Sequence, residues 1–109
     1  MDDVVVTAGK SSGNIWSSTK ALSSVANAFK HWKDHAAEFP EFNNAVQYVK
    51  GAKYFMNNEI EGQLTKIRPN GDFLKYHPQT NTFGITNSMG APRTMFRPEK
   101  GMEYWLSLK

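Results

Sequence analysis

The chain has 109 residues, a net charge of +3 and no cysteine. This length is typical of one domain with a modest core, and the lack of cysteine excludes disulfides, thiolate metal sites and cysteine-based catalysis. No segment approaches the roughly 18 consecutive apolar residues of a membrane-spanning helix, and the first residues lack the layout of a signal peptide.

Positive charge is concentrated in the second half of the chain. Residues 1–62 contain six lysines, no arginine and seven acidic residues, whereas residues 63–98 contain five basic residues and one aspartate. The second half would therefore attract an anionic partner such as nucleic acid. A basic face that serves only solubility is the alternative, and charge alone does not decide between the two.

The N-terminal part of the chain predicts a junction followed by a helix. Residues 1–13 are small and polar, so we expect a linker there and a folded domain over residues 14–109, as in a piece of a longer protein. From Trp16 to Ala36, apolar residues recur at the spacing of one helix face. Pro40 disfavours helical geometry at Phe39, which predicts that this helix ends at or before that residue.

A second helix is predicted over residues 42–57. Its apolar stripe consists of Ala45, Val46, Val49, Ala52 and Met56. Asn43 or Asn44 can cap the start of this helix, and the pair Asn57-Asn58 can end it.

After residue 62 the apolar pattern changes to the period of two that is typical of strands. Four short segments are rich in β-branched and aromatic residues and are separated by turn signals: QLTKIR, DFLKYH, NTFGIT and PRTMFR. Short connections, such as the turn at Pro69-Asn70-Gly71, favour antiparallel neighbours. The predicted fold is therefore α+β, with two N-terminal helices packed on one face of a four-stranded twisted antiparallel sheet.

The last strand combines charged and apolar side chains. Neighbours on a regular strand point to opposite faces, so Arg93 and Thr94 can reach one ligand only if the strand bulges or ends there. If Arg93 and Arg97 face outward, Lys75 and His77 can join them on an open basic face. Whether they do depends on the register of the sheet, which the sequence leaves open.

Two histidines lie four residues apart on the first predicted helix. His31 and His35 therefore share a side of the helix, a spacing that can bind a metal ion. Trp32, however, stands where a zinc protease motif has its catalytic glutamate. For His35, the alternative is a histidine favoured by the dipole at the helix end.

The remaining reactive side chains suit metal-free cleavage of RNA. The sequence contains no phosphate-binding glycine loop or serine elbow, and the scarcity of carboxylates in the second half argues against a glycosidase pair. Histidine can act as general base or acid, arginine matches phosphate oxygens, and a threonine hydroxyl can donate to them. Tyr76, Phe83 and Tyr104 could stack on bases, although core packing is the more common role of such aromatics.

Three segments carry a resemblance to a known family: HWKDHAAEFPEFNNAVQYVKGAKYFMNN, NGDFLKYHPQTNTFGITNSMGAPRTMFRP and GMEYW. From about Phe29 to Trp105 the chain resembles the C-terminal toxin domains of contact-dependent growth inhibition systems and other bacterial polymorphic toxins. The particular type is the tRNase of the barnase–colicin–RelE-like superfold. The resemblance implies cleavage of tRNA without a metal or other cofactor, by attack of a ribose 2′-OH on the adjacent phosphate.

The resemblance also implies a biological setting. The domain would be delivered as the C-terminal part of a larger secreted protein and would act in the cytoplasm of a target bacterium. In the producing cell a cognate immunity protein would bind it as a monomer and neutralise it. The alternative is a non-catalytic nucleic-acid-binding or protein-interaction module that uses a basic sheet face.

The resemblance assigns roles to individual residues. His35 would be the general base or acid, Arg93 the transition-state cation and Thr94 a phosphate donor. Tyr76 falls on a patterned tyrosine of the second strand and joins this catalytic group. The expected substrate contacts are Lys75, His77, Arg97, Tyr104 and His31, and the last of these is also the alternative to His35 as the working histidine.

Overall fold

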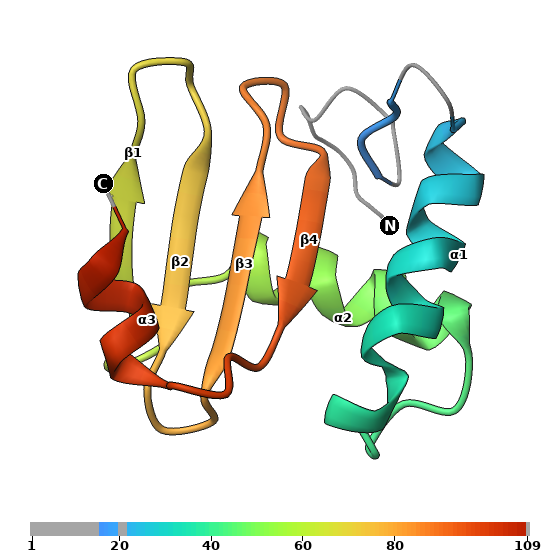
Figure 1. Cartoon of the computed structure of the whole chain (residues 1–109). Coiled ribbons are helices and arrows are strands. Elements are labelled where there is room, and N and C mark those ends of the chain that lie inside the picture. Colours follow the sequence, from blue (N-terminus) through green and yellow to red (C-terminus); the bar gives the residue numbers. More distant parts are fainter. Residues whose placement is uncertain (1–15, 20–21, 109) are drawn as a thin grey trace.

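The structure is a computed structural model that describes residues 16–19 and 22–108; the predicted linker lies outside the described residues. It confirms the α+β class, with three α-helices and a four-stranded antiparallel sheet (Figure 1). The helices are α1 (Ser24–His35), α2 (Ala45–Asn57) and α3 (Met102–Ser107), with a 3-10 turn at Ala36–Glu38. The strands are β1 (Leu64–Ile67), β2 (Phe73–His77), β3 (Thr82–Thr86) and β4 (Pro92–Phe96).

The first helix is shorter than its apolar pattern predicted. The Ser23 hydroxyl accepts the Ala26 N–H at 3.2 Å and caps α1, so the helix begins at Ser24. Trp16 precedes the helix, and its assignment to the helical stripe was wrong, although its side chain is fully buried in the core. The helix ends before Phe39, as Pro40 predicted.

The second helix ends at the predicted residue but begins at Ala45, three residues later than predicted. The Asn44 side chain accepts the Gln47 N–H at 2.9 Å, which selects Asn44 over Asn43 as the cap. The helix ends at Asn57, and the N–H of Asn58 closes its last turn on the carbonyl of Tyr54. Side-chain capping therefore accounts for the start of both α1 and α2.

The strands form a meander in the order β1-β2-β3-β4, with every neighbouring pair antiparallel. Gly71 adopts a φ of 94° in the turn between β1 and β2, the conformation that the Pro69-Asn70-Gly71 sequence predicted. Tyr76 pairs with Leu64 on one side and Phe83 on the other, and Phe83 pairs with Phe96. These four residues therefore share one face of the sheet.

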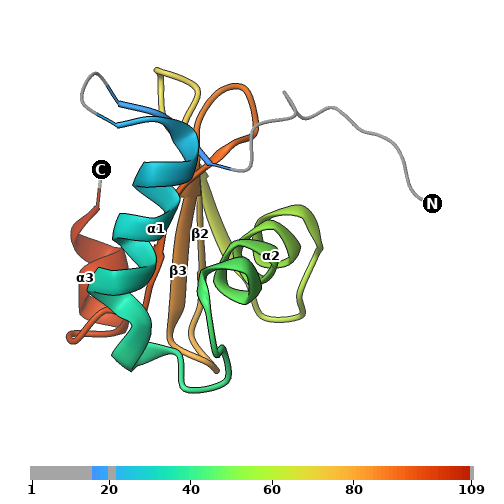
Figure 2. The ribbon, with the colours of Figure 1, turned by 90° about the vertical axis from the view of Figure 1, so that its right-hand side faces the viewer.

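The helices lie on different sides of the sheet (Figure 2). α2 packs on one face, here called the back face, and α1 contacts both α2 and the β4 edge. α3 packs on the opposite, front face, where Trp105 stacks on Tyr76 at 6.0 Å between ring centroids. Because α3 packs here, the front face is partly covered rather than wholly open. The sequence did not predict this helix.

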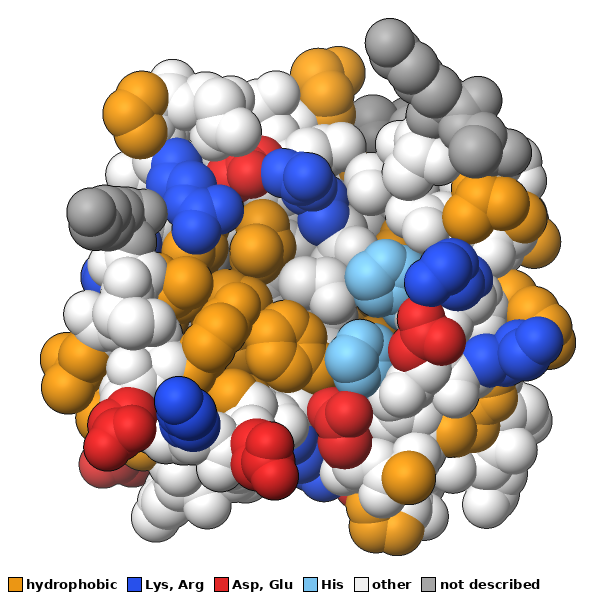
Figure 3. Space-filling model, in the orientation of Figure 1, with side chains coloured by type: hydrophobic (Ala, Val, Ile, Leu, Met, Phe, Trp, Pro, Cys, Tyr) orange, Lys and Arg blue, Asp and Glu red, His pale blue; other side chains and the backbone are white. Residues whose placement is uncertain are grey.

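Between α3 and α1, part of the front face remains accessible. Figure 3 shows this face. Its hydrophobic side chains form a surface patch, here called the apolar floor, which is bordered by Lys and Arg on one side and by histidine side chains on another. In the described part of the chain, no helix is long and apolar enough to cross a membrane.

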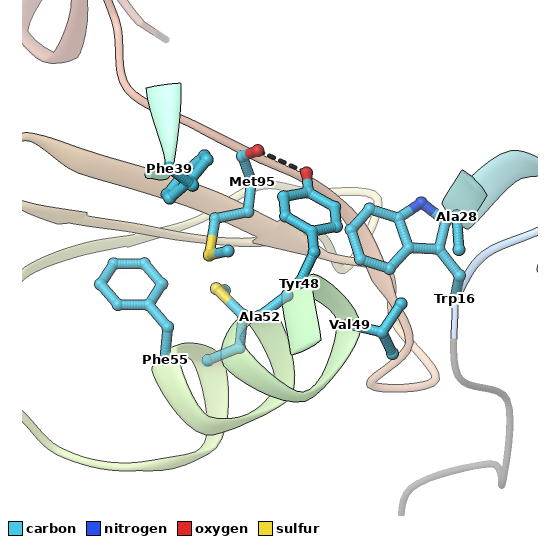
Figure 4. Close-up of a cluster of buried hydrophobic side chains, with 9 residues drawn as sticks. Trp16, Ala28, Phe39, Tyr48, Val49, Ala52, Phe55 and Met95 are labelled. Atoms are coloured by element: carbon cyan, nitrogen blue, oxygen red, sulfur yellow. Dashed lines mark hydrogen bonds between the residues drawn. The ribbon is translucent and has the colours of Figure 1, made fainter. Parts of the chain in front are cut away.

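The main core lies between α2 and the back face (Figure 4). Tyr48 is fully buried at its centre, and its hydroxyl donates to the Met95 carbonyl at 2.5 Å. Burial raises the pKa of this hydroxyl far above its ordinary value, so it remains a donor. At Gly84 an added Cβ would lie 2.6 Å from the Met56 sulfur and 3.3 Å from the Phe55 ring, so any other residue would require these side chains to shift.

The Tyr48 hydroxyl provides a test of this core. We expect Tyr48→Phe to lower the free energy of unfolding by about 1–3 kcal/mol, because the buried Met95 carbonyl would lose its donor. The matched control is Tyr54→Phe on the same helix, where the side chain is 66% exposed and the change should stay within about 0.5 kcal/mol. Equal stabilities of the two variants in urea denaturation would contradict this role.

Candidate functional site

A β-bulge in β4 resolves the question that Arg93 and Thr94 raised in the sequence. Ile85 pairs with Thr94 and Thr86 pairs with Pro92, so Arg93 is an extra residue opposite this step of β3. The extra residue interrupts the alternation of side chains, which otherwise sends neighbours to opposite faces. Arg93 and Thr94 consequently line the same pocket, as the bulged alternative predicted.

The pocket has a volume of about 450 Å³ and lies where α1, the segment before it and the ends of the strands meet. Its lining consists of Ser17, Ser18, Thr19, Asn27, His31, Arg68, Ile85, Asn87, Arg93 and Thr94. Two arginines, an imidazole, hydroxyls and amides therefore line this space, and none of its described lining residues carries a carboxylate. Such a set of donors favours an anion, and arginine in particular matches phosphate oxygens.

The Arg93 guanidinium is hydrogen-bonded through one nitrogen, and much of the side chain is exposed. Its Nη1 donates to a carboxylate oxygen of Asp72, whose side chain is only 5% exposed. The Asn70 side-chain amide donates to the same carboxylate oxygen at 3.2 Å. The Arg93 side chain remains 47% exposed, and Asp72 is its hydrogen-bond partner among the described residues. The aspartate thus orients the guanidinium while leaving N–H groups for a ligand.

His31 joins the pocket from α1. Its Nδ1 lies 3.2 Å from the Thr94 hydroxyl oxygen, so the helix and the bulge meet through this pair. The pKa of His31 lies below its ordinary value of 6.5, first because of burial and then because of the positive charges of His35 and Lys30. Asp34 opposes this shift. At neutral pH the His31 imidazole is therefore mainly uncharged and able to accept a proton.

His35 lies one turn further along α1, with its ring centroid 6.0 Å from that of His31. Its Nδ1 lies 2.9 Å from Oε2 of Glu38, and its ring stacks on Phe96 at 5.4 Å. Tyr104 of α3 meets the edge of Phe96 at 5.5 Å. The two histidines and Tyr104 thus border the same apolar floor of the front face.

Three predicted substrate contacts lie away from this pocket, and they do not form the open basic face that the sequence allowed. Lys75, His77 and Arg97 occupy the back face, which α2 and the segment before it cover. Lys75 Nζ donates to the carbonyls of Phe55 and Asn58, at 2.6 and 2.5 Å, where α2 ends. These bonds secure the end of the helix.

The other two back-face residues also have structural partners. His77 bonds the Thr80 hydroxyl at 2.8 Å and the Glu61 carbonyl at 3.1 Å. Arg97 forms an ion pair with Glu41 at 2.6 Å, and its guanidinium lies 4.4 Å from the Phe39 ring centroid. Lys75, His77 and Arg97 therefore have structural partners within the described part of the chain and do not form an open basic face.

Tyr76 is a core residue and lies away from the pocket. Its side chain is 2% exposed, and its hydroxyl donates to the Asn81 side chain at 2.6 Å. Asn81 has a φ of 53° in the turn between β2 and β3, so the tyrosine stabilises this turn. Burial raises the pKa of Tyr76, which disfavours a role as a proton donor. Packing, the more common role of such aromatics, is what the structure shows.

Sequence reasoning missed several residues of the site. Ser17, Ser18 and Thr19 lie in a segment without helix or strand, and only their position before α1 brings them to the pocket. Arg68 follows β1 at the turn beside Asp72; its basic charge in the positive half of the chain was the available signal. Glu38 lies three residues after His35, a spacing that a search for acidic partners of the histidines would have found.

Comparison of the sequence with known protein families and with curated proteins gives no match. Among residues 16–19 and 22–108, no three His, Asp or Glu side chains form a group that could hold a metal ion. The interpretation of the site therefore depends on its own geometry.

His35 and Asp34 should have opposite effects on the pKa of His31. We expect His31 to titrate below 6.5, His35→Asn to raise its pKa, and Asp34→Asn to lower it. Because the folded state resists protonation of His31, its contribution to stability should fall as the pH drops below 6.5. Imidazole C–H resonances followed by NMR measure these values. Shifts of the same sign in both variants would show that charge does not control this histidine.

Proposed function

We propose that this chain is a metal-independent endoribonuclease, a bacterial toxin domain that cleaves tRNA. The observation that carries the proposal is the meeting of His31, Arg93 and Thr94 in one pocket, with His35 one helical turn away. The resemblance to tRNase toxin domains of contact-dependent growth inhibition systems supports the same reading.

The proposed reaction uses the two imidazoles as base and acid. His31 takes the proton of a ribose 2′-OH, whose oxygen attacks the adjacent phosphorus. The bond from phosphorus to the 5′-oxygen breaks, and His35 gives that oxygen a proton. The products are a 2′,3′-cyclic phosphate and a free 5′-OH. The lowered pKa of His31 favours the base role, because its imidazole is neutral at the working pH.

Cations and hydroxyls of the pocket would stabilise the charge that develops on the phosphate. Arg93 is the strongest candidate because Asp72 fixes its orientation before the substrate arrives. Thr94 can donate its hydroxyl from the neighbouring position, since the bulge turns both residues to one side. Arg68 adds a second guanidinium to the lining.

The apolar floor would receive the bases next to the cleaved bond. Phe96 lies between His35 and Tyr104, at centroid distances of 5.4 and 5.5 Å. Both aromatic rings are partly exposed on the face that carries the histidines, where an unpaired base can stack. Tyr104 thereby keeps the substrate-binding role that the sequence assigned to it.

The biological setting follows from the resemblance. The domain would reach the cytoplasm of a target cell as the C-terminal part of a larger secreted protein. A cognate immunity protein would bind the monomeric domain and protect the producing cell.

Incubation with total bacterial RNA in excess EDTA tests the proposal. We expect discrete tRNA fragments with 2′,3′-cyclic phosphate ends. His31→Ala, His35→Ala and Arg93→Ala should each lower the rate by at least about 100-fold, because each removes a proton-transfer group or the principal cation. The matched cation control is Lys53→Ala on α2, which lies outside the pocket and should leave the rate unchanged.

Two outcomes would overturn the proposal. Intact RNA with the wild-type domain would exclude cleavage, and gel-shift binding of the same RNA would then favour a non-catalytic nucleic-acid-binding module. Equal cleavage by the wild type and the histidine variants would exclude the proposed acid and base.

A further inference from the structure

Glu38 accepts two hydrogen bonds on its two carboxylate oxygens. Oε2 lies 2.9 Å from Nδ1 of His35, and Oε1 accepts the backbone N–H of Arg97 at 2.8 Å. The Glu38 side chain is 33% exposed and that of His35 is 24% exposed, so both are partly shielded from water. The carboxylate therefore bridges the histidine of α1 and the chain that leaves β4.

A carboxylate only accepts hydrogen bonds, and this determines which nitrogen of His35 carries the proton. Nδ1 must donate to Glu38, so in the neutral imidazole Nε2 bears the lone pair. Among the described residues Nε2 has no hydrogen-bond partner. It is therefore the nitrogen available for exchanging a proton with a ligand, and stacking on Phe96 restricts rotation of the ring.

From this geometry we propose that Glu38 is the positioning residue of His35, which presents Nε2 as the nitrogen that exchanges the proton. This inference rests on the proposed ribonuclease function for its catalytic consequence. The structural part of the inference, that Nδ1 of the neutral His35 imidazole carries the proton, does not depend on that function. The ionisable groups that face His35 are Glu38 and, on α1, His31 and Asp34. On the β4 side the ring meets Phe96, which is uncharged.

Glutamine cannot replace the carboxylate in this position. The Arg97 N–H is a backbone donor and always requires an acceptor, so the single carbonyl of a glutamine would be used there. The amide NH₂ would then face Nδ1 of His35 and could only donate to it. The variant Glu38→Gln should therefore move the proton of the neutral imidazole from Nδ1 to Nε2.

The proton position can be measured without RNA. In long-range ¹H–¹⁵N NMR of the folded domain at a pH where His35 is neutral, we expect the Nδ1–H tautomer in the wild type. Glu38→Gln should show the Nε2–H tautomer. The matched control is Glu41→Gln. The Glu41 carboxylate pairs with the Arg97 side chain and contacts neither His31 nor His35. An Nε2–H tautomer in the wild type, or no change in Glu38→Gln, would overturn the inference.

Activity gives the second readout. Glu38→Gln removes the acceptor that orients the His35 ring through Nδ1, so we expect kcat to fall by at least about 10-fold. Glu41→Gln should leave kcat unchanged. A Glu38→Gln variant that shows the Nε2–H tautomer and keeps the wild-type kcat would overturn the catalytic part of the inference. If the wild type has the expected tautomer but cleaves no RNA, the proposed function fails while the structural part stands.

Discussion

The close approach of α2 to the back face of the sheet is the constraint on which the rest of the structure depends. Gly84 has no side chain, so Met56 and Phe55 of the helix pack directly on β3. The Tyr48 hydroxyl then joins the helix to β4 through the Met95 carbonyl. Because this packing closes the back face, the charged residues there must find internal partners. The pocket that contains His31, Arg93 and Thr94 lies away from this packing, at the edge of the front face.

At that edge, a single inserted residue combines side chains that a regular strand would separate. With Arg93 as the extra residue, the guanidinium and the Thr94 hydroxyl reach one pocket. The buried Asp72 and the His31 imidazole then hold them from the β1–β2 turn and from α1, respectively. Residues from three separate parts of the chain thus meet around one polar space, which explains why no single sequence motif describes the site.

Local sequence patterns predicted most of the fold and only part of the site. Asn44 and Gly71 mark the start of α2 and the first hairpin turn through chemistry within a few residues, so both were predictable. α3 contains only six residues, too few for a helical period to be distinct. Alternation correctly placed Lys75 and His77 on one face of their strand, whereas their grouping with Arg97 depends on the register of the sheet. Which face α2 covers is likewise a tertiary property. A bulge likewise leaves no distinct sequence pattern, so the sequence posed the Arg93-Thr94 question without answering it.

The segment that precedes α1 forms one wall of the pocket and is also anchored in the fold. The Ser17 N–H donates to the Pro92 carbonyl at 2.7 Å, and the Asn27 side chain donates to the Ser17 carbonyl at 3.1 Å. Trp16 anchors the same segment through its buried indole. A fragment that begins at Ser24 would lose one side of the pocket together with the Ser23 cap of α1 and the buried Trp16 indole. This segment therefore links the stability of the domain to the shape of its pocket, and a cut within it would weaken both.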